Sequence, residues 1–288
     1  MMNNLISMML VLLFGTVSYA NDKSEIYKAA INSAVMITNL GANSGGSGIV
    51  LKSKGTQSYV LTNNHVCQVI KQGGLVTMSV PVPGPYPGYY KHSHQIQEYK
   101  LYKSHDLCLV KVYVNLNTGV KIAKKAPDVQ ESGIAVGHPG LLPLTISSGK
   151  FTNRKNARLI IRLEECSDID KQRDFYCLFY GGKPIIKVFE SRVFTGLISP
   201  GSSGSGIYNS SGELVNVVFA GRGNRSQAFS VPYNYVVNFL KNHKKYKWVS
   251  VNDKPKKKKG VISEIIEMQY EFGTTNYMIW DANLWNIL

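Results

Sequence analysis

The chain has 288 residues, with 33 Lys and Arg against 18 Asp and Glu, a formal net charge of +15. Hydrophobic residues make up 44% of it, and a chain of this length can bury a large core. After the first 20 residues no apolar stretch reaches the roughly 20 residues that a membrane-spanning helix needs. These properties exclude a polytopic membrane protein and indicate a globular one.

Residues 1–20 predict a signal peptide. An apolar run from Leu5 to Val17 is too short for a comfortable membrane span, and the small residues Ser18 and Ala20 suit a signal-peptidase site. The alternative is an uncleaved N-terminal anchor. We therefore expect a secreted or periplasmic, hence extracytoplasmic, protein that begins at Asn21 and has no transmembrane span in the mature chain.

The rest of the chain is typical of an all-β fold. Asp22 and Glu25 form a capping-box pattern that predicts one short N-terminal helix. Apolar runs of five to eight residues then recur between Gly, Pro, Asn and Ser turns, a pattern of barrels or sandwiches. A later helix is predicted to begin after Pro232, and its apolar face consists of Tyr235, Val236, Phe239 and Leu240.

The C-terminal part separates into two segments. Residues 241–259 hold nine lysines and one aspartate, and 246–260 are interpreted as a Lys-rich, solvated linker. Contact of Lys254 to Lys259 with an anionic surface is the alternative, and no nucleic-acid partner is expected. The tail, 261–288, is apolar and acidic, so it should dock on a barrel or a partner. Within it, Tyr277 to Trp280 has the composition of a strand.

A small-residue stretch, Gly201 to Gly206, is the candidate for a nucleophile loop. It lies between an apolar run and a strand-like segment, and its glycines would let backbone N–H groups approach a substrate carbonyl oxygen. The alternative is a flexible polar loop. Upstream, His65 ends one apolar segment and Asp106 precedes another. The order His, Asp, Ser is the one found in chymotrypsin.

These motifs resemble those of trypsin-like serine proteases, closest to the bacterial HtrA/Deg and glutamyl-endopeptidase-like branch, over residues 24–245. The matching segments are Gly45 to Val50, Tyr59 to Val66, Asp106 to Val112, Val136 to Gly140, Leu144 to Gly149, Pro200 to Gly206, Gly212 to Val215 and Ala228 to Pro232. The 28 residues after Gly260 are too few for the PDZ domain that many HtrA proteins carry.

The resemblance implies two six-stranded antiparallel β-barrels, with a short N-terminal helix and a C-terminal helix. The first, 21–120, would carry His65 and Asp106, and the second, 121–245, would carry Ser203. Residues 157–191 exceed what the family needs at this place, so a long hairpin insertion is predicted there.

The resemblance also implies the chemistry of a serine endopeptidase that acts on a protein or peptide substrate. Ser203 would attack the peptide carbonyl to give an acyl-enzyme, His65 would take its proton, and Asp106 would orient the imidazole. His65 should therefore lie close to both other residues. Backbone N–H groups of Gly201 and Ser203 would form the oxyanion hole.

Two serines compete with Ser203 for the role of nucleophile. Ser202 stands where the family usually has Asp or Asn, and Ser205 stands where it usually has Gly. The Gly two positions before and the Gly immediately after favour Ser203. No partner for a newly cut N-terminus is present at Ser202, so no trypsin-style activation cleavage is expected.

By the same resemblance, five residues would line the substrate pocket: Leu197, Ile198, Phe219, Ala220 and Gly221. No carboxylate stands at the pocket floor, which disfavours Lys or Arg before the cleaved bond. A small or medium apolar residue is expected there, with an acidic or polar one, favoured by Arg222 and the Gln227 region, as the alternative.

The four cysteines, behind a predicted signal peptide, indicate an oxidising compartment. Cys166 and Cys177 are the better-placed pair for a disulfide. Cys67 and Cys108 each follow a triad residue by two positions, and both a second disulfide and a pair of buried thiols remain open. No CxxC or HxxxH spacing occurs, so no metal and no cofactor are expected.

Two other functions compete with the peptidase. One is a catalytically silent binding protein on the same fold, holding a partner or an anionic surface with its basic segment or tail. The other is an esterase, because acyl transfer to water uses the same groups. The intact set of His, Asp and Ser favours an enzyme over the binding protein.

Overall fold

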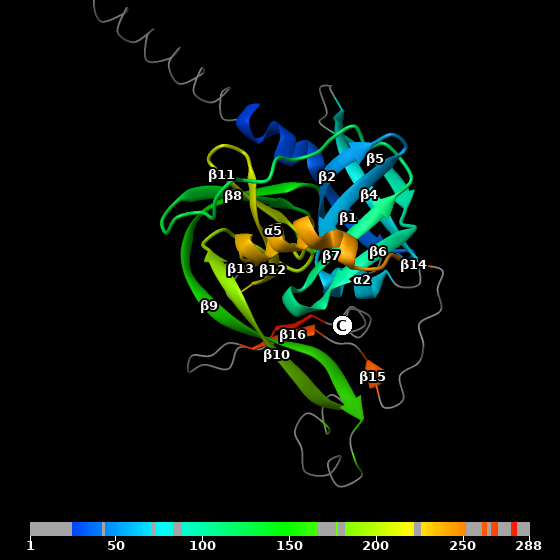
Figure 1. Cartoon of the computed structure of the whole chain (residues 1–288), viewed down its shortest axis with the longest axis vertical. Helices are drawn as coiled ribbons and strands as arrows, with labels where there is room; N and C mark the ends of the chain where they lie inside the picture. The colour runs from blue at the N-terminus through cyan, green and yellow to red at the C-terminus, as the bar shows by residue number, and fades with distance from the viewer. Residues whose placement is uncertain are drawn as a thin grey trace, which may run out of the picture.

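The computed structural model describes residues 25–41, 44–70, 73–82, 88–165, 167, 177, 182–221, 226–251, 261–263, 266–269 and 278–280. Strands dominate, and they form two antiparallel sheets that lie side by side (Figure 1). The predicted signal peptide 1–20, the start at Asn21, Asp22 and the stretch Lys254 to Lys259 lie outside the described residues.

The first sheet contains eight strands in the order β14-β6-β7-β3-β2-β1-β4-β5. Their bounds are Ala34–Asn39 (β1), Gly45–Lys54 (β2), Gln57–Thr62 (β3), Gly74–Val82 (β4), Gly88–Gln95 (β5), Glu98–Tyr102 (β6), Leu107–Val112 (β7) and Val249–Ser250 (β14). β-Branched side chains such as Val35, Val60 and Val110 fill its core. A short helix, α2 (Asn64–Val69), follows β3, and a 3-10 turn, η1 (Lys103–His105), precedes β7.

The second sheet is a closed six-stranded barrel. Its strands are Ser132–Gly137 (β8), Thr145–Glu165 (β9), Gly182–Phe194 (β10), Gly206–Asn209 (β11), Leu214–Gly221 (β12) and Ala228–Val231 (β13). They follow the order β10-β13-β12-β11-β8-β9, and pairing of β9 with β10 closes the ring. The 3-10 turn η2 (Pro139–Leu141) connects β8 to β9.

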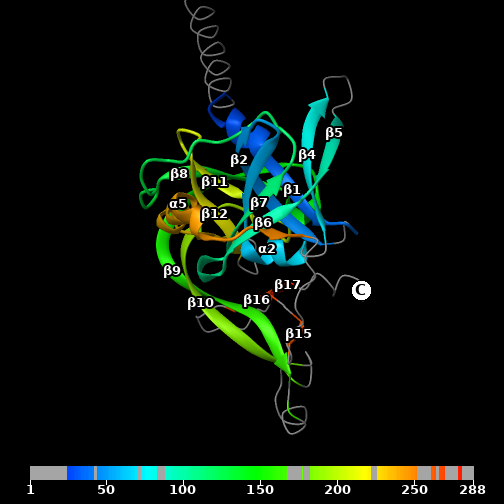
Figure 2. The same ribbon diagram turned by 45° about the vertical axis from the view of Figure 1, so that its right-hand side comes forward.

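The predicted chymotrypsin-like, mostly β fold is confirmed, with one difference in the first half. Within the described ranges, the two outer strands of the first sheet, β5 and β14, do not pair with each other. That sheet is thus an open half-barrel, lengthened by the β4–β5 hairpin, which projects from the body in Figure 2.

Helices are few, as expected. Residues 25–33 are helical, and α5 (Tyr233–Asn242) begins directly after Pro232, as predicted. Val236 and Phe239 on its apolar face are buried. A 3-10 turn, η3 (His243–Lys245), follows α5. No helix within the described ranges is long and apolar enough to span a membrane.

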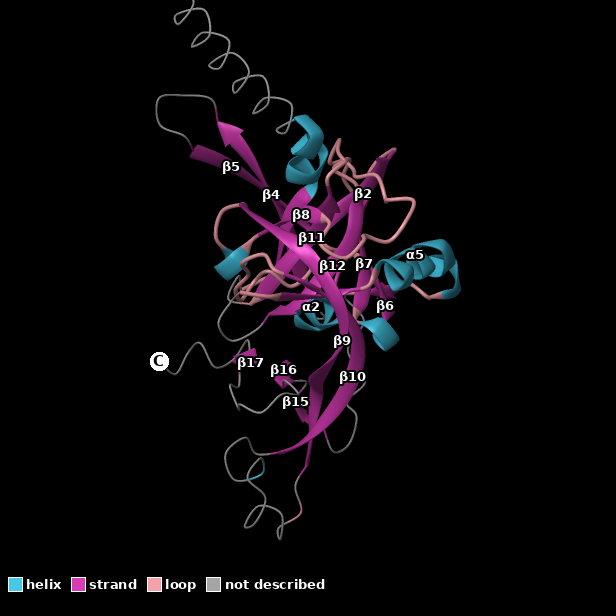
Figure 3. Ribbon diagram, turned by 90° about the vertical axis from the view of Figure 1, so that its left-hand side faces the viewer, coloured by secondary structure: helices cyan, strands magenta, loops and turns pink. Residues whose placement is uncertain are grey.

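Strands β9 and β10 continue past the barrel as a long two-stranded arm (Figure 3). Three short strands of the tail follow: Val261–Ser263 (β15), Ile266–Gln269 (β16) and Met278–Trp280 (β17). β15 and β16 both pair with β9, whereas β17 pairs with β16. The tail therefore does add to the second sheet, but it pairs with β9 through β15 and β16 rather than through the predicted segment at 277–280, of which Tyr277 lies outside the described residues.

Candidate active site

His65 lies on helix α2, not on a strand. Strand β3 ends at Thr62, and Asn63 keeps extended backbone angles as the N-cap, so the helix starts one residue before His65. The side chains of Val66 and Cys67 are buried, which fixes the helix on the first sheet. The sequence pattern placed His65 at the end of a strand, because six helical residues are too few to show helical periodicity.

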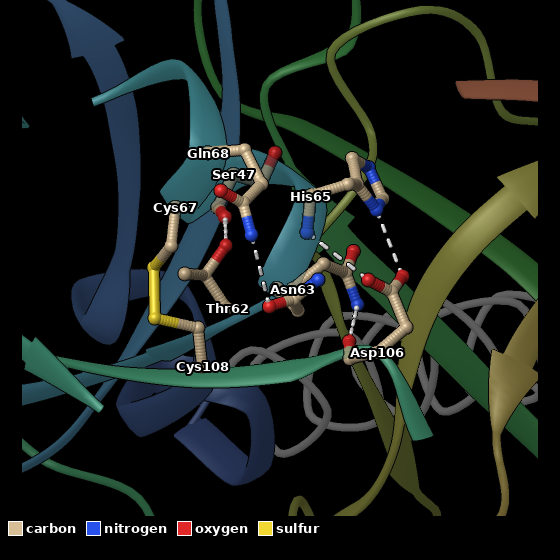
Figure 4. The surroundings of a disulfide bond; sticks show 9 residues. Ser47, Thr62, Asn63, His65, Cys67, Gln68, Asp106 and Cys108 are labelled. Atoms are coloured by element: carbon tan, nitrogen blue, oxygen red, sulfur yellow. Dashed lines mark hydrogen bonds and ion pairs between the residues drawn. A yellow bond between two sulfur atoms is a disulfide. The ribbon is translucent and has the colours of Figure 1, made fainter. Parts of the chain in front are cut away.

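Asp106 is buried in the turn before β7, with only 5% of its surface exposed. Its Oδ1 accepts the backbone N–H of His65 at 3.0 Å, and its Oδ2 lies 2.8 Å from His65 Nδ1 (Figure 4). A carboxylate only accepts hydrogen bonds, so Nδ1 carries the proton and Nε2 is left as the acceptor. Asp106 thus fixes both the orientation and the tautomer of the imidazole.

The backbone of Asp106 is left-handed, with φ of 52°. Aspartate tolerates this conformation better than most residues. The buried side chain of Asn63 holds the turn, because its Nδ2 donates to the Asp106 carbonyl oxygen at 3.0 Å (Figure 4). Sequence reasoning missed Asn63, although it stands two residues before His65.

A disulfide joins Cys67 to Cys108 and resolves the alternatives left open by their spacing. It ties α2 to β7 beside the His65–Asp106 pair (Figure 4). Cys177 is also disulfide-bonded. Its expected partner, Cys166, lies outside the described residues, so that pairing stays a prediction.

The chain before Ser203 forms a type II turn. The N–H of Ser202 donates to the carbonyl oxygen of Ser199 at 3.0 Å, Pro200 occupies the second position, and Gly201 has a φ of 89°. This combination defines the type II geometry, in which glycine is favoured at the third position. A Cβ on Gly201 would also lie 2.6 Å from the His138 carbonyl oxygen, so no side chain fits.

The turn directs the Gly201 N–H away from η2. The carbonyl oxygen of Pro200 accepts the N–H of Gly140, and in a trans peptide the C=O and N–H point in opposite directions. Across the part of the chain that the structure describes, the N–H groups of Gly201 and Ser203 have no acceptor. Two adjacent unused donors beside a serine hydroxyl can bind an oxyanion.

The three serines of the loop lie in different surroundings. Ser202 Oγ accepts the N–H of Ser199 at 3.2 Å, and Ser205 packs against Gly137. Ser203 Oγ donates to the Phe219 carbonyl oxygen at 3.3 Å. Among the described residues no hydrogen bond joins Ser203 to His65, so their expected proximity stays a prediction.

Four of the five residues expected to line the pocket are buried: Ile198, Phe219, Ala220 and Gly221. A Cβ added to Gly221 would lie 2.4 Å from Ile198 Cδ1, so the Ile198 side chain reaches across to β12. Leu197, by contrast, is 70% exposed. Arg222 lies outside the described residues. Within the described part of the chain, no group of three or more His, Cys, Asp or Glu could hold a metal ion.

Such a site, carried on two antiparallel β-sheets, places the protein among the chymotrypsin-like serine endopeptidases. The chain belongs to the trypsin-like peptidase domain family, whose sequence profile matches residues 46–217. The match begins next to Ser47 and ends in β12. A comparison with curated protein sequences found no match.

Solved structures with a similar fold include proteases of low sequence identity. The active form of the Rv3671c protease from M. tuberculosis has a TM-score of 0.52 and 18% identity, over 75% of this chain and 82% of that one. An inactive mutant form of Rv3671c has a TM-score of 0.51 and 18% identity, over 75% of this chain and 88% of that one. A serine endoprotease from Yersinia pestis has a TM-score of 0.52 and 17% identity, over 76% of this chain and 65% of that one.

Proposed function

We propose that the protein hydrolyses peptide bonds through an acyl-enzyme on Ser203, with His65 as general base and Asp106 as its orienting group. The observation that carries this proposal is the two-point contact of the Asp106 carboxylate with His65, through the backbone N–H and Nδ1. This contact leaves Nε2 free to accept a proton.

The reaction begins with rotation of Ser203 Oγ away from the Phe219 carbonyl oxygen towards His65 Nε2. Oγ forms a bond to the peptide carbon while its proton passes to Nε2. The N–H groups of Gly201 and Ser203 stabilise the oxyanion. When the C–N bond breaks, the imidazolium gives its proton to the leaving amine, and the acyl-enzyme remains.

Water then hydrolyses the acyl-enzyme. His65 takes a proton from water, the resulting hydroxide adds to the ester carbon, and the bond to Ser203 Oγ breaks. Oγ recovers the proton, and a peptide with a new carboxylate leaves. No cofactor enters any of these steps.

For the residue before the cleaved bond, we favour a small or medium apolar side chain. The pocket would be formed by Leu197, Ile198 and the segment from Phe219 to Gly221. Ile198 is only 7% exposed and its Cδ1 lies against Gly221, which supports a narrow, uncharged pocket.

We also propose an extracytoplasmic location. The disulfide between Cys67 and Cys108 supports it, since disulfides persist in oxidising compartments, and the apolar N-terminal run agrees with it. Mass spectrometry of secreted protein should find Asn21 as the first residue, whereas an intact Met1 in a membrane fraction would contradict secretion.

A fluorophosphonate probe tests the peptidase against the silent binding protein. The wild-type protein should be labelled, and Ser203→Ala should abolish labelling. Ser202→Ala and Ser205→Ala are the matched controls and should retain it. Labelling of Ser203→Ala would overturn the assignment of the nucleophile, and an unlabelled, correctly folded wild type would favour the binding protein.

A further inference from the structure

Ser47 of strand β2 contacts the nucleophile loop at two places and His138 at a third, although it belongs to the other sheet. Its Oγ donates to the Gly201 carbonyl oxygen at 2.7 Å and accepts the N–H of His138 at 2.8 Å. Its backbone N–H donates to the Ser203 carbonyl oxygen at 2.6 Å. The residue is completely buried, so no water competes for these bonds.

The position of Ser47 is itself fixed by a contact within the first sheet. Its carbonyl oxygen accepts a hydrogen bond from the Thr62 hydroxyl at 2.7 Å (Figure 4). Thr62 directly precedes Asn63, the N-cap of the His65 helix. Its neighbour Gly46 lies under the loop, where a Cβ would approach the Ser203 carbonyl oxygen to 2.7 Å. The first sheet therefore reaches Ser203 through the start of β2, which is bonded to the end of β3 that leads to His65.

These contacts determine how the peptide groups of the loop are turned. The Gly201 carbonyl points to Ser47, so the Ser202 N–H points the opposite way, to Ser199, and closes the type II turn. The preceding carbonyl, of Pro200, is held by Gly140, two residues after His138. Ser47 Oγ thus joins the nucleophile loop to the segment from His138 to Gly140, which also bonds to the carbonyl oxygen of Pro200.

The conformation to be excluded is a flip of the peptide between Pro200 and Gly201. Gly140 bonds to the carbonyl of that peptide, and Ser47 acts next to it, on the Gly201 carbonyl oxygen and on the N–H of His138. A flip converts the type II turn to type I and replaces the Gly201 N–H by the Pro200 carbonyl oxygen at the same place. The hole would then present an acceptor to the oxyanion, where it needs a donor.

We propose that Ser47 is a positioning residue for the oxyanion hole: its bonds to the carbonyl oxygens of Gly201 and Ser203 fix the peptide groups next to those that carry the two N–H donors. The inference rests on the proposed peptidase function. Ser47→Ala leaves a buried acceptor on Gly201 and a buried donor on His138 without their partner. The oxyanion is fully developed only beyond the ground state, so the loss falls on turnover more than on substrate binding.

The chain provides a matched control at Ser58. This residue is also completely buried in the first sheet, its Oγ donates to the Val114 carbonyl oxygen at 2.7 Å, and it accepts the N–H of Leu116 at 3.0 Å. It also shares a hydrogen bond with Ser53 Oγ at 2.8 Å, so Ser58→Ala removes a comparable set of buried hydrogen bonds at a place that does not contact the nucleophile loop.

The test measures kcat and KM on a peptide that the wild type cleaves, together with affinity for a peptide boronate. We expect Ser47→Ala to lower kcat about tenfold to hundredfold with KM changed less than threefold. Boronate affinity should fall by the same factor as kcat/KM. Ser58→Ala should lower the melting temperature to a similar extent and leave kcat, KM and boronate affinity near their wild-type values.

A further variant, Ser47→Cys, keeps a weak donor at this place and should fall between wild type and alanine. It also serves if the alanine variant does not fold. Equal kcat in Ser47→Ala and Ser58→Ala, or a loss that appears only in KM, would overturn the inference. Failure of the proposed function is distinguishable, because the wild type would then neither cleave peptides nor react with fluorophosphonate.

Discussion

Cys67 and Cys108 are disulfide-bonded across a sequence separation of 41 residues. The bond joins the helix of His65 to the strand that follows Asp106, so it cross-links the two elements whose distance matters most for a histidine–carboxylate pair. The Asp106 hydrogen bonds to His65 do not pass through it. Its contribution should therefore be to stability rather than to turnover.

Replacement of both Cys67 and Cys108 by alanine should lower the free energy of unfolding by about 4 kcal/mol, from the loop that the bond closes. Urea unfolding followed by tryptophan fluorescence measures this change. Below the melting temperature kcat should stay within a few-fold of wild type. An unchanged unfolding midpoint would contradict this account, and loss of activity in a still-folded variant would show that the bond also sets the geometry of the pair.

The second disulfide is expected between Cys166 and Cys177. A non-reducing digest of protein from its native compartment should contain the two cysteines in one linked peptide. The loop is short, so the stabilisation should be about 2–3 kcal/mol. Free thiols at both positions, seen by alkylation before reduction, would rule the bond out.

Ile198→Ala should widen the range of residues accepted before the cleaved bond. The Ile198 side chain reaches Gly221, and its removal leaves space for larger apolar groups, with a change of about 1–3 kcal/mol in discrimination for each methylene accommodated. Cleavage of a peptide library by both proteins measures this. Val129→Ala is the control, because that side chain is half-exposed and is not among the five pocket residues. An identical profile for Ile198→Ala would remove Ile198 from the pocket.

Glu190 should contribute stability that depends on pH. The hydrogen bond from Tyr235 at 2.7 Å, and next the contact with Arg154, lower the pKa of Glu190 below its ordinary value. A lowered folded-state pKa gives stability that is complete above the unfolded pKa, near 4.5, and is lost as the pH falls through the folded value.

Glu190→Gln should therefore have a lower melting temperature than the wild type at pH 7. The melting temperatures of the two proteins should converge as the pH falls. The carboxylate is partly exposed, so the effect should stay below about 1 kcal/mol. Thermal melts of both proteins between pH 7 and pH 2.5 measure the difference. Glu25→Gln, which breaks only an exposed pair with Lys28, is the control. A constant difference at every pH would assign the effect to packing.

The sequence was most informative where chemistry depends on residue order. His65 and Asp106 could be recognised because each borders an apolar strand, and α5 because Val236 and Phe239 recur with helical spacing. Contacts between distant segments carry no such pattern. The bonds of Ser47 to Gly201 and of Gly140 to Pro200 join residues far apart in the chain, and neither end shows a local signal beyond its glycines.

Other features depended on geometry that spacing does not determine. Cys67 and Cys108 allowed either a bond or two thiols, and only the placement of α2 on β7 decided between them. Closure of the second sheet rests on the long register between β9 and β10, whereas the first sheet stays open because β5 and β14 extend its two edges. Whether a sheet closes is a property of strand stagger, not of composition.

The pairing of the tail with β9 has a consequence for how molecules of this protein meet one another. The β9–β10 arm extends beyond the barrel, and one side of β9 takes up β15 and β16. A bare strand edge is a template for a strand of another chain, and the tail occupies this one. Protein truncated after Lys259 should therefore associate through its arms in a concentration-dependent way that light scattering detects, while the full-length chain keeps this edge closed to its neighbours.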